Sequence, residues 1–335
     1  MLATKLPGYQ IIAALYQGAS SIIYRAIQET DQRTVVIKTT RSAFPAPQDV
    51  ARLRHEFAVA SFVQSQGIIR PLTLFVATER PVLVLEDING QSLDAFVHGH
   101  LIRIETGLRI ALLLTQTLVD LHRQQVIHRD IKPQNIIVGP AADLVKLTDF
   151  GISSRLSREQ QQPVALRSFE GTLAYMSPEQ TGRINRAVDQ RSDFYSLGVT
   201  LYEIFTGTLP FSGADPAELV YAHIARLPTP PRALRTDLPS DLDAVLLKLL
   251  AKTPEERYQS GEGLLDDLEE VQRRYARGDV LPFQVGTFDA ARTLQLSQHL
   301  YGRSVERAAV LDAFERVVGG SGELLLVTGD AGAGK

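Results

Sequence analysis

The stretch VIHRDIKPQN, residues 126–135, decides how the rest of this chain is interpreted. It places Asp130, Lys132 and Asn135 close together in a loop-like region without helix or strand periodicity. A second acidic turn, with the sequence DFG at residues 149–151, follows fourteen residues after Asn135. Either stretch alone is compatible with a surface loop or a common turn. Only their order and spacing, taken with the flanking sequence, point to a function.

Predicted strands dominate the residues that precede this stretch. Short β-branched or apolar runs, separated by turn formers, cover residues 10–16, 22–27, 35–39 and 82–86. One helix, rich in Ala, Leu and Arg, is predicted around residues 49–64.

The larger part of the chain is predicted to be helical. From residue 106 onward one apolar stripe recurs at helical spacing, formed by Ile110, Leu114, Leu118 and Leu121. Two short strands are predicted at 136–138 and 145–147, and further helices begin after Asp215 and at Ser240. A strand-rich part followed by a larger helical part predicts an α+β fold with two lobes.

The composition limits the classes of protein that the chain can represent. It has 335 residues, 44% of them hydrophobic, and a formal net charge of −3, so we expect a folded chain of about two domains and no nucleic-acid partner. The absence of cysteine excludes disulfides and thiolate zinc sites. The N-terminus lacks a signal-peptide core, and no stretch reaches the ~20 apolar residues of a membrane span. We therefore expect a cytoplasmic protein.

The motifs resemble those of protein kinases. Residues 128–135 match the catalytic-loop pattern His-Arg-Asp-x-Lys-x-x-Asn, and residues 149–151 match the Asp-Phe-Gly motif. The sequence VVIK at 35–38 resembles the family's Val-Ala-Ile-Lys strand, and SPE at 177–179 stands for Ala-Pro-Glu. The resemblance covers residues 9–274 and implies a bilobal kinase fold with a β-rich and an α-rich lobe.

The resemblance implies a site for ATP and Mg²⁺. Lys38 is expected to hold the α- and β-phosphates, with Glu56 on the following helix as its partner. Asp149 and Asn135 offer an acidic and a neutral oxygen ligand for Mg²⁺. The adenine and phosphate contacts are expected from Gly18, Ile23, Val36, Leu85, Glu86 and Ile137.

The resemblance also implies the chemistry and the acceptor. Asp130 is expected to accept the proton of the substrate hydroxyl, and Lys132 to reach the transferring γ-phosphate. Lys132 between Asp130 and Asn135 is typical of kinases that phosphorylate serine or threonine, and Thr172 matches the threonine that supports the catalytic aspartate in that class. The expected partner is therefore a protein with a Ser or Thr acceptor.

Three further matches concern architecture and regulation. Asp193 resembles the buried aspartate that braces the catalytic loop, and Arg257 the arginine that pairs with Glu179. Arg129 supplies a cation for a phosphorylated activation segment. The expected autophosphorylation site is Ser168.

The phosphate loop, residues 16–23, departs from the family pattern Gly-x-Gly-x-x-Gly-x-Val. Only Gly18 is kept, and Tyr16 and Ser21 replace the other two glycines. Glycines let backbone amides approach phosphates closely, so reduced ATP affinity is expected. The alternative to an active kinase is a pseudokinase or a nucleotide-gated regulatory scaffold, although no charged catalytic residue is missing.

The C-terminal residues suggest a second domain. Residues 275–300 are interpreted as a linker. Residues 301–335 end in GDAGAGK, which resembles a P-loop without its final Ser or Thr, and so the truncated start of an AAA-type ATPase domain. A kinase followed by such a domain resembles the N-terminal part of multidomain bacterial sensor proteins that also carry GAF and histidine-kinase domains. The downstream ATPase and sensor domains are then further expected partners.

Overall fold

The computed structural model describes residues 6–18, 20–76, 80–155, 173–213, 215–279 and 281–289, with residues 309, 312, 313, 316 and 326. The chain divides into two compact units, residues 1–292 and 293–335. The first unit contains both predicted lobes. The GDAGAGK motif at 329–335 lies outside the described residues.

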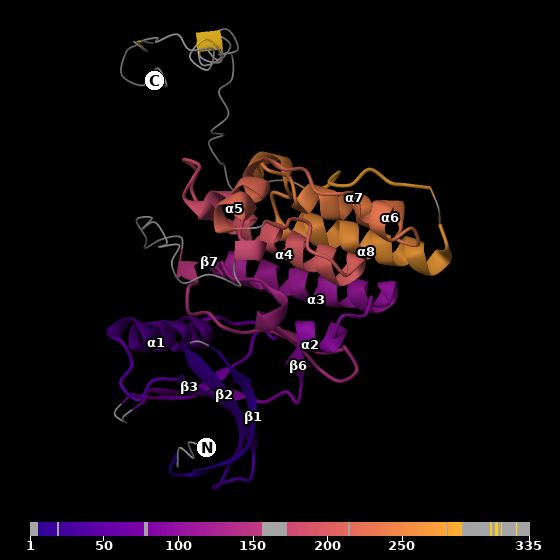
Figure 1. The fold of residues 1–335 in the computed structure, drawn as a ribbon. Helices are drawn as coiled ribbons and strands as arrows, with labels where there is room; N and C mark the ends of the chain where they lie inside the picture. Colours follow the sequence, from indigo (N-terminus) through magenta and orange to yellow (C-terminus); the bar gives the residue numbers. More distant parts are fainter. Residues whose placement is uncertain are drawn as a thin grey trace. The chain divides into compact units, whose positions relative to one another are not determined.

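The N-terminal lobe is an antiparallel five-stranded sheet with one helix beside it (Figure 1). The strand order is β1-β2-β3-β5-β4. The bounds are β1 (Tyr9–Gln17), β2 (Ser21–Gln28), β3 (Thr34–Thr40), α1 (Pro47–Phe62), β4 (Pro71–Phe75) and β5 (Val82–Glu86). The four predicted strands and the predicted helix are confirmed, and β4 is the strand that the apolar pattern does not indicate.

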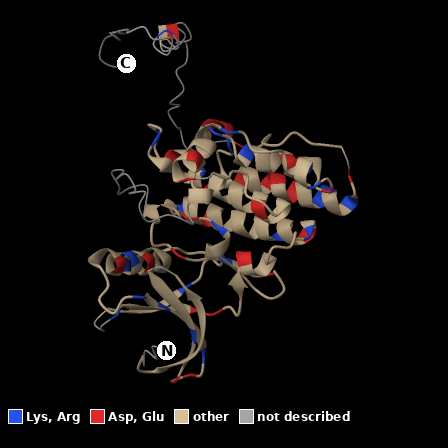
Figure 2. Ribbon diagram, in the orientation of Figure 1, with Lys and Arg blue, Asp and Glu red and all other residues tan. Residues whose placement is uncertain are grey.

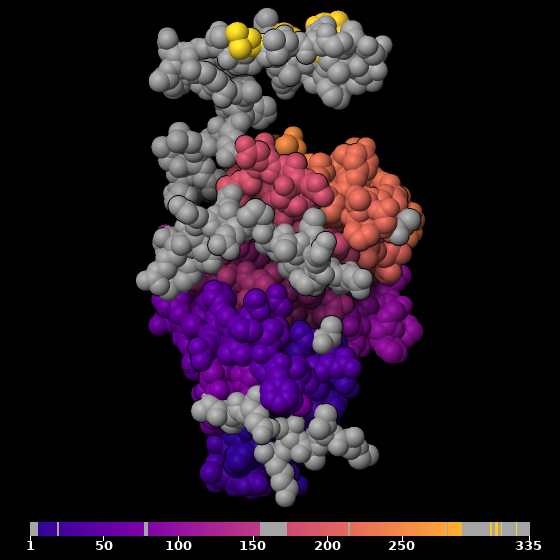
Figure 3. Space-filling view, turned by 60° about the vertical axis from the view of Figure 1, so that its left-hand side comes forward, coloured from indigo at the N-terminus to yellow at the C-terminus, as the bar shows by residue number. Residues whose placement is uncertain are grey.

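The C-terminal lobe is mainly helical, as predicted. Its helices are α2 (Leu93–Val97), α3 (Ile104–Arg123), α4 (Gln190–Thr206), α5 (Pro216–Ala225), α6 (Pro231–Leu234), α7 (Ser240–Leu249) and α8 (Gly261–Arg277). Short strands lie where this lobe meets the sheet: β6 (Gln91–Ser92), β7 (Val126–Ile127), β8 (Ile136–Val138), β9 (Val145–Leu147) and β10 (Ser154–Arg155). Single 3₁₀ turns are η1 (Pro133–Asn135), η3 (Leu173–Tyr175), η4 (Pro178–Thr181) and η5 (Pro254–Glu256). Figure 3 shows the two lobes in space-filling form, with the indigo residues of the sheet below the helical lobe.

The core of the helical lobe forms around α3 and α4. The predicted stripe on α3 is buried in one cluster with residues of α4, α7 and α8. Burying one leucine side chain contributes about 2 kcal/mol, so this face holds α3 in place. Helix α4 is buried on nearly every side, which is typical of a central helix.

Helix α8 and the residues after it close the first unit. The helix ends at Arg277, with Gly278 in the left-handed conformation that favours glycine (φ 73°). Beyond it, both Asp289 carboxylate oxygens accept hydrogen bonds from the Gln259 amide, at 3.0 and 2.8 Å. The Gly286 amide donates to Asp267 Oδ2 at 2.6 Å. Part of the segment interpreted as a linker is therefore bound to the helical lobe through side-chain carboxylates.

Charges of both signs are interspersed over the two lobes (Figure 2). Of the helices that the structure describes, none is both long enough and apolar enough to cross a membrane.

Candidate active site

A buried lysine joins the two lobes. Lys38 lies on β3, and its Nζ is 2.8 Å from Glu56 Oε2 on α1. The same Nζ is 3.0 Å from Asp149 Oδ1, which follows β9 in the helical lobe. The structure thus brings together three residues that are far apart in the sequence.

The charges in this group stabilise one another. Burial opposes the charged form of Lys38, but Asp149 and Glu56 outweigh it and hold the pKa of Lys38 above its usual value. Burial raises the pKa of Glu56 to about 7 against the opposing effect of Lys38. For Asp149, Lys38 overcomes the effect of burial and lowers the pKa to about 2. Lys38 is therefore a cation held between two carboxyl groups.

Asp149 has an unusual backbone conformation. Its φ of 65° lies in the left-handed region, which is uncommon for residues other than glycine. Phe150 next to it is buried, and its ring lies 4.8 Å from the His128 ring, centre to centre. Residues in such conformations concentrate at functional sites, where surrounding packing maintains them.

The catalytic loop forms a compact network around Asp130. Lys132 Nζ donates to both carboxylate oxygens of Asp130, at 3.0 and 2.8 Å. Asn135 Nδ2 donates to the backbone oxygen of Asp130 at 2.9 Å and to its Oδ2 at 2.8 Å. The Asp130 carboxylate is thereby oriented by two neighbours from its own loop.

The buried Asp193 of α4 stabilises the backbone of this loop through hydrogen bonds. It accepts from the His128 amide at 2.9 Å and from the Arg129 amide at 2.8 Å. His122 Nε2 lies 2.9 Å from the same carboxylate. Burial opposes the charged form, but His122 prevails and the pKa of Asp193 is lowered. Arg129 has a φ of 68°, so these bonds help to maintain a strained backbone.

A second buried pair anchors the turn at 177–181. Arg257 donates to the two carboxylate oxygens of Glu179 at 2.7 and 2.9 Å. Gln180 Nε2 donates to the Arg129 backbone oxygen at 2.9 Å. The turn is therefore bonded both to the helical core and to the catalytic loop.

The residues expected around adenine lie at the junction of the lobes. Val36, Leu85 and Ile137 pack in one hydrophobic cluster together with Ile88. Ile23 on β2 is paired with Lys38 of β3. The Glu86 carboxylate accepts from Lys146 Nζ at 2.6 Å and from the Arg70 amide at 2.9 Å. The Glu86 side chain is thus occupied by protein contacts.

The phosphate loop is closed by local contacts. The Gly18 amide donates to the Ser21 backbone oxygen at 2.9 Å, and Arg41 Nη1 donates to the Gly18 backbone oxygen at 3.4 Å. A Cβ added at Gly18 would lie 2.7 Å from the Tyr16 ring. The tyrosine in place of the first glycine therefore covers the one glycine that remains.

Comparison with known proteins identifies the family. The family described as "Protein kinase domain" matches residues 9–267. The chain belongs to the protein kinase family. It is 34% identical over 269 residues to the serine/threonine-protein kinase PknB of Mycobacterium tuberculosis, an alignment that covers 78% of this chain and 42% of PknB.

Other bacterial kinases are similarly related. The chain is 29% identical over 267 residues to the probable serine/threonine-protein kinase CPE1738 of Clostridium perfringens, covering 79% of this chain and 38% of that protein. It is 31% identical over 273 residues to the probable serine/threonine-protein kinase SCO3848 of Streptomyces coelicolor, covering 78% and 39%. The chain thus spans about two fifths of the length of these kinases.

The donor set of this kinase domain fits a magnesium ion that also binds phosphates. Asp149 provides an ionised carboxylate, and Asn135 donates through Nδ2, which leaves its amide oxygen as a cation ligand. Among the residues that the structure describes, no group of three or more His, Cys, Asp or Glu could hold a metal alone. Mg²⁺ is usually bound through one or two carboxylates together with substrate phosphates, and Asp149 offers one such carboxylate.

Sequence reasoning missed several polar contacts of this kinase domain. No motif indicates three of these contacts: Lys146 with Glu86, His55 Nε2 with the Ser153 backbone oxygen (2.7 Å), and Arg25 with Asp87. Each links residues at least 60 positions apart, and only the fold brings them together. The expected phosphorylation site Ser168 and the supporting Thr172 lie outside the described residues.

Proposed function

We propose that this chain is an active serine/threonine protein kinase that transfers the γ-phosphate of ATP to hydroxyl groups of proteins in the cytoplasm. The observation that carries the proposal is the three-residue group of Lys38, Glu56 and Asp149, next to the Asp130 network. Phosphoryl transfer needs mainly positioning and charge neutralisation. The ion pairs of Lys38 and the hydrogen bonds of Asp130 support both requirements.

Each residue has a specific task in this proposal. Lys38 binds the α- and β-phosphates, and Asp130 accepts the proton of the attacking hydroxyl. The substrate oxygen forms a bond to the γ-phosphorus as the bond to the β–γ bridging oxygen breaks and ADP leaves. Lys132 offsets the charge on the transferring group. Asn135 and Asp149 would hold Mg²⁺, which would supply neutralisation of phosphate charge.

The serine/threonine preference is supported by Lys132 in the catalytic loop and by the names of the bacterial relatives. The adenine site is proposed among Ile23, Val36, Leu85 and Ile137, with Glu86 contributing only through its backbone. We propose Ser168 as the autophosphorylated residue, with Arg129 as the cation that binds the phosphate. Mass spectrometry that locates all phosphate elsewhere on active protein would refute this site.

The experiment compares the wild type with Asp149→Ala. Wild type is expected to gain thermal stability with Mg-ATP and to incorporate phosphate, whereas the variant loses phosphate incorporation by about 10³-fold. Asp149→Asn serves as the closer steric match. Phosphate incorporation that stays at the wild-type level in both variants refutes the active-kinase proposal.

A regulatory scaffold is the second candidate function. The replacement of two loop glycines by Tyr16 and Ser21 favours it, because it alters the loop that covers the phosphates. Nucleotide-induced stabilisation without phosphate incorporation by wild type would support the scaffold and reject the kinase.

We further propose that residues 301–335 begin an AAA-type ATPase domain of a multidomain bacterial sensor protein that functions in a two-component system. Support comes from the motif GDAGAGK and the apolar run at 323–328 before it. The motif predicts Ser or Thr directly after Lys335, followed by the remainder of a parallel sheet. A continuation without them contradicts the proposal.

A further inference from the structure

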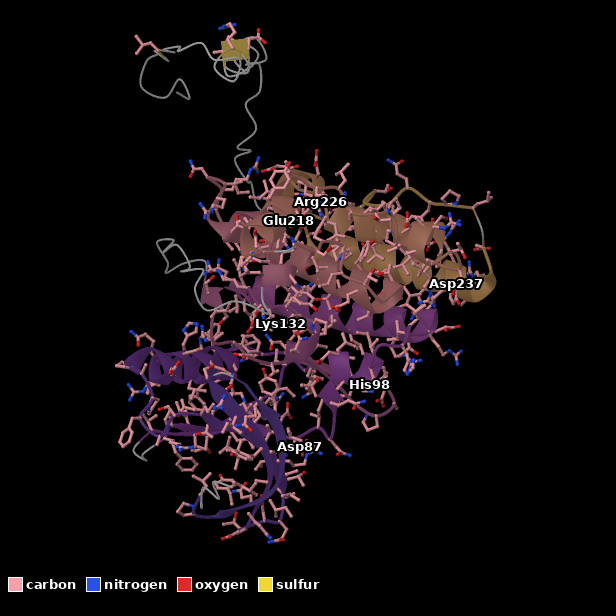
Figure 4. The ribbon with its side chains drawn as sticks, in the orientation of Figure 1. Asp87, His98, Lys132, Glu218, Arg226 and Asp237 are labelled. Carbon is pink, nitrogen blue, oxygen red and sulfur yellow. The ribbon has the colours of Figure 1, made fainter. Side chains whose placement is uncertain are left out.

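An ion pair connects the N-terminal sheet to the segment between the lobes. Arg25 lies on β2, and its Nε is 2.7 Å from Asp87 Oδ2. A second contact joins Arg25 Nη2 to Asp87 Oδ1 at 3.2 Å. Figure 4 labels Asp87 beside the strands of the sheet. The guanidinium thus lies against both carboxylate oxygens, through a hydrogen bond from Nη2 and an ion-pair contact from Nε.

Asp87 also organises the turn that it begins. The Asn89 amide donates to Asp87 Oδ1 at 2.8 Å, and Asn89 has a φ of 52°. Arg25 Nη2 also lies 3.5 Å from the Gly90 backbone oxygen. One guanidinium therefore contacts both ends of the segment 87–90.

The ion pair connects the two elements that flank the proposed adenine site. Arg25 follows Ile23 by two residues on β2, so the two side chains share one face of the strand. On the other side, a Cβ at Gly90 would lie only 2.7 Å from Ile137 Cγ2, so the turn packs closely on β8. The strand that carries Ile23 is thus bonded to the turn that rests on Ile137.

We propose that Arg25 and Asp87 are positioning residues that set the separation of Ile23 and Ile137 and so prepare the cleft for ATP. The inference rests on the proposed function. The Asp87 side chain is 4% exposed and that of Arg25 25%. A carboxylate buried to this degree is costly without its partner, so losing Arg25 displaces it toward water and disturbs the turn.

Loss of the Arg25–Asp87 pair is expected to affect ATP binding rather than phosphate transfer. A preorganised cleft binds its ligand without first ordering the segments that form it. Removing the pair therefore weakens ATP binding, while the Asp130 network and the buried Asp193 brace remain intact. KM for ATP should change more than kcat.

The experiment uses the full chain with Arg25→Leu, Asp87→Asn and the double variant. Asn at position 87 keeps the oxygen that accepts from the Asn89 amide and removes only the charge. Each single variant is expected to raise KM for ATP about fivefold with kcat within about twofold, and the double variant no further than the larger single effect. Arg25→Lys, which keeps the charge, is expected to restore part of the affinity.

The matched control is Arg226→Leu, which removes an ion pair on α5 (Figure 4). Arg226 and Glu218 lie 3.4 Å apart with side chains 47% and 41% exposed. KM for ATP is expected to stay at the wild-type value, which shows that loss of an ion pair alone has no such effect.

Calorimetric titration with Mg-ATP provides a readout that needs no phosphate transfer. An inactive wild type whose ATP affinity falls in Arg25→Leu rejects the proposed function and supports the positioning role. An active wild type with unchanged KM in both single variants overturns the positioning role, as does a double variant whose effect is the product of the two. Absence of Mg-ATP binding by wild type rejects both.

Discussion

The catalytic loop and the phosphate loop serve the same proposed reaction, yet they are built differently. The catalytic loop rests on buried polar groups, among them Asp193 with its three donors. In the described part of the phosphate loop, the contacts are backbone hydrogen bonds and one from the exposed Arg41 side chain, and Tyr16 is 55% exposed. A buried polar group is costly to leave without a partner, whereas an exposed one is solvated. A substitution in the catalytic loop is therefore expected to cost more stability than one in the phosphate loop.

The largest effect is expected in the buried region, from Arg257→Leu. The change leaves the Glu179 carboxylate buried without its cation, which costs about 3–5 kcal/mol of unfolding free energy. Urea denaturation followed by circular dichroism measures the loss. The exposed-pair variant Arg226→Leu should lose less than about 1 kcal/mol. Equal losses in the two variants would contradict the contrast between buried and exposed pairs.

An intermediate effect is expected from His223, which lies on α5 in the same lobe. Burial, with nearby Lys252, lowers its pKa to about 4, and Tyr195 Oη lies 2.9 Å from its Nδ1. The folded chain therefore resists protonation of His223. The neutral imidazole of His223 contributes fully to the unfolding free energy above its unfolded-state pKa of about 6.5. This contribution is lost as the pH falls toward 4.

The measurement is the unfolding free energy of wild type and His223→Gln at pH 7 and pH 5. Wild type is expected to lose about 2 kcal/mol more than the variant over this interval. Because all other titrating groups are common to both proteins, the difference isolates His223. If the unfolding free energies of wild type and variant fell equally between pH 7 and pH 5, protonation of His223 would make no contribution and the prediction would be wrong.

The smallest effect is expected in the phosphate loop, from Gly18→Ala. Gly18 does not have a positive φ, and the three atoms nearest to an added Cβ all belong to the side chain of the exposed Tyr16. The ring can move aside, so KM for ATP should change by no more than about twofold. In a Tyr16→Ala background the same substitution should have no effect. A tenfold rise in that background would show that the glycine itself is required.

The sequence predicted the elements whose pattern is local or whose motif is specific. The apolar stripe of α3 indicated its buried face, and the resemblance to protein kinases implied that Lys38 and Asp149 belong to one site. The strand β4 was not predicted, although its sequence PLTLF is largely apolar; it begins with Pro71, a residue that argues against a strand interior. The linker predicted at residues 275–300 rests on the absence of periodicity, and contacts through single carboxylates, such as that of Asp289, give no periodic signal.

By itself, the sequence determined the family, the residue types of the site and the order in which they occur, because these follow from motif and period. Only the tertiary structure decided the ion pairs that no motif carries. The Arg25–Asp87 and Lys146–Glu86 pairs join residues from separate strands and turns. Such pairs form only where packing of the apolar faces has already excluded water and fixed the backbone, since a charge removed from water requires a partner at hydrogen-bond distance.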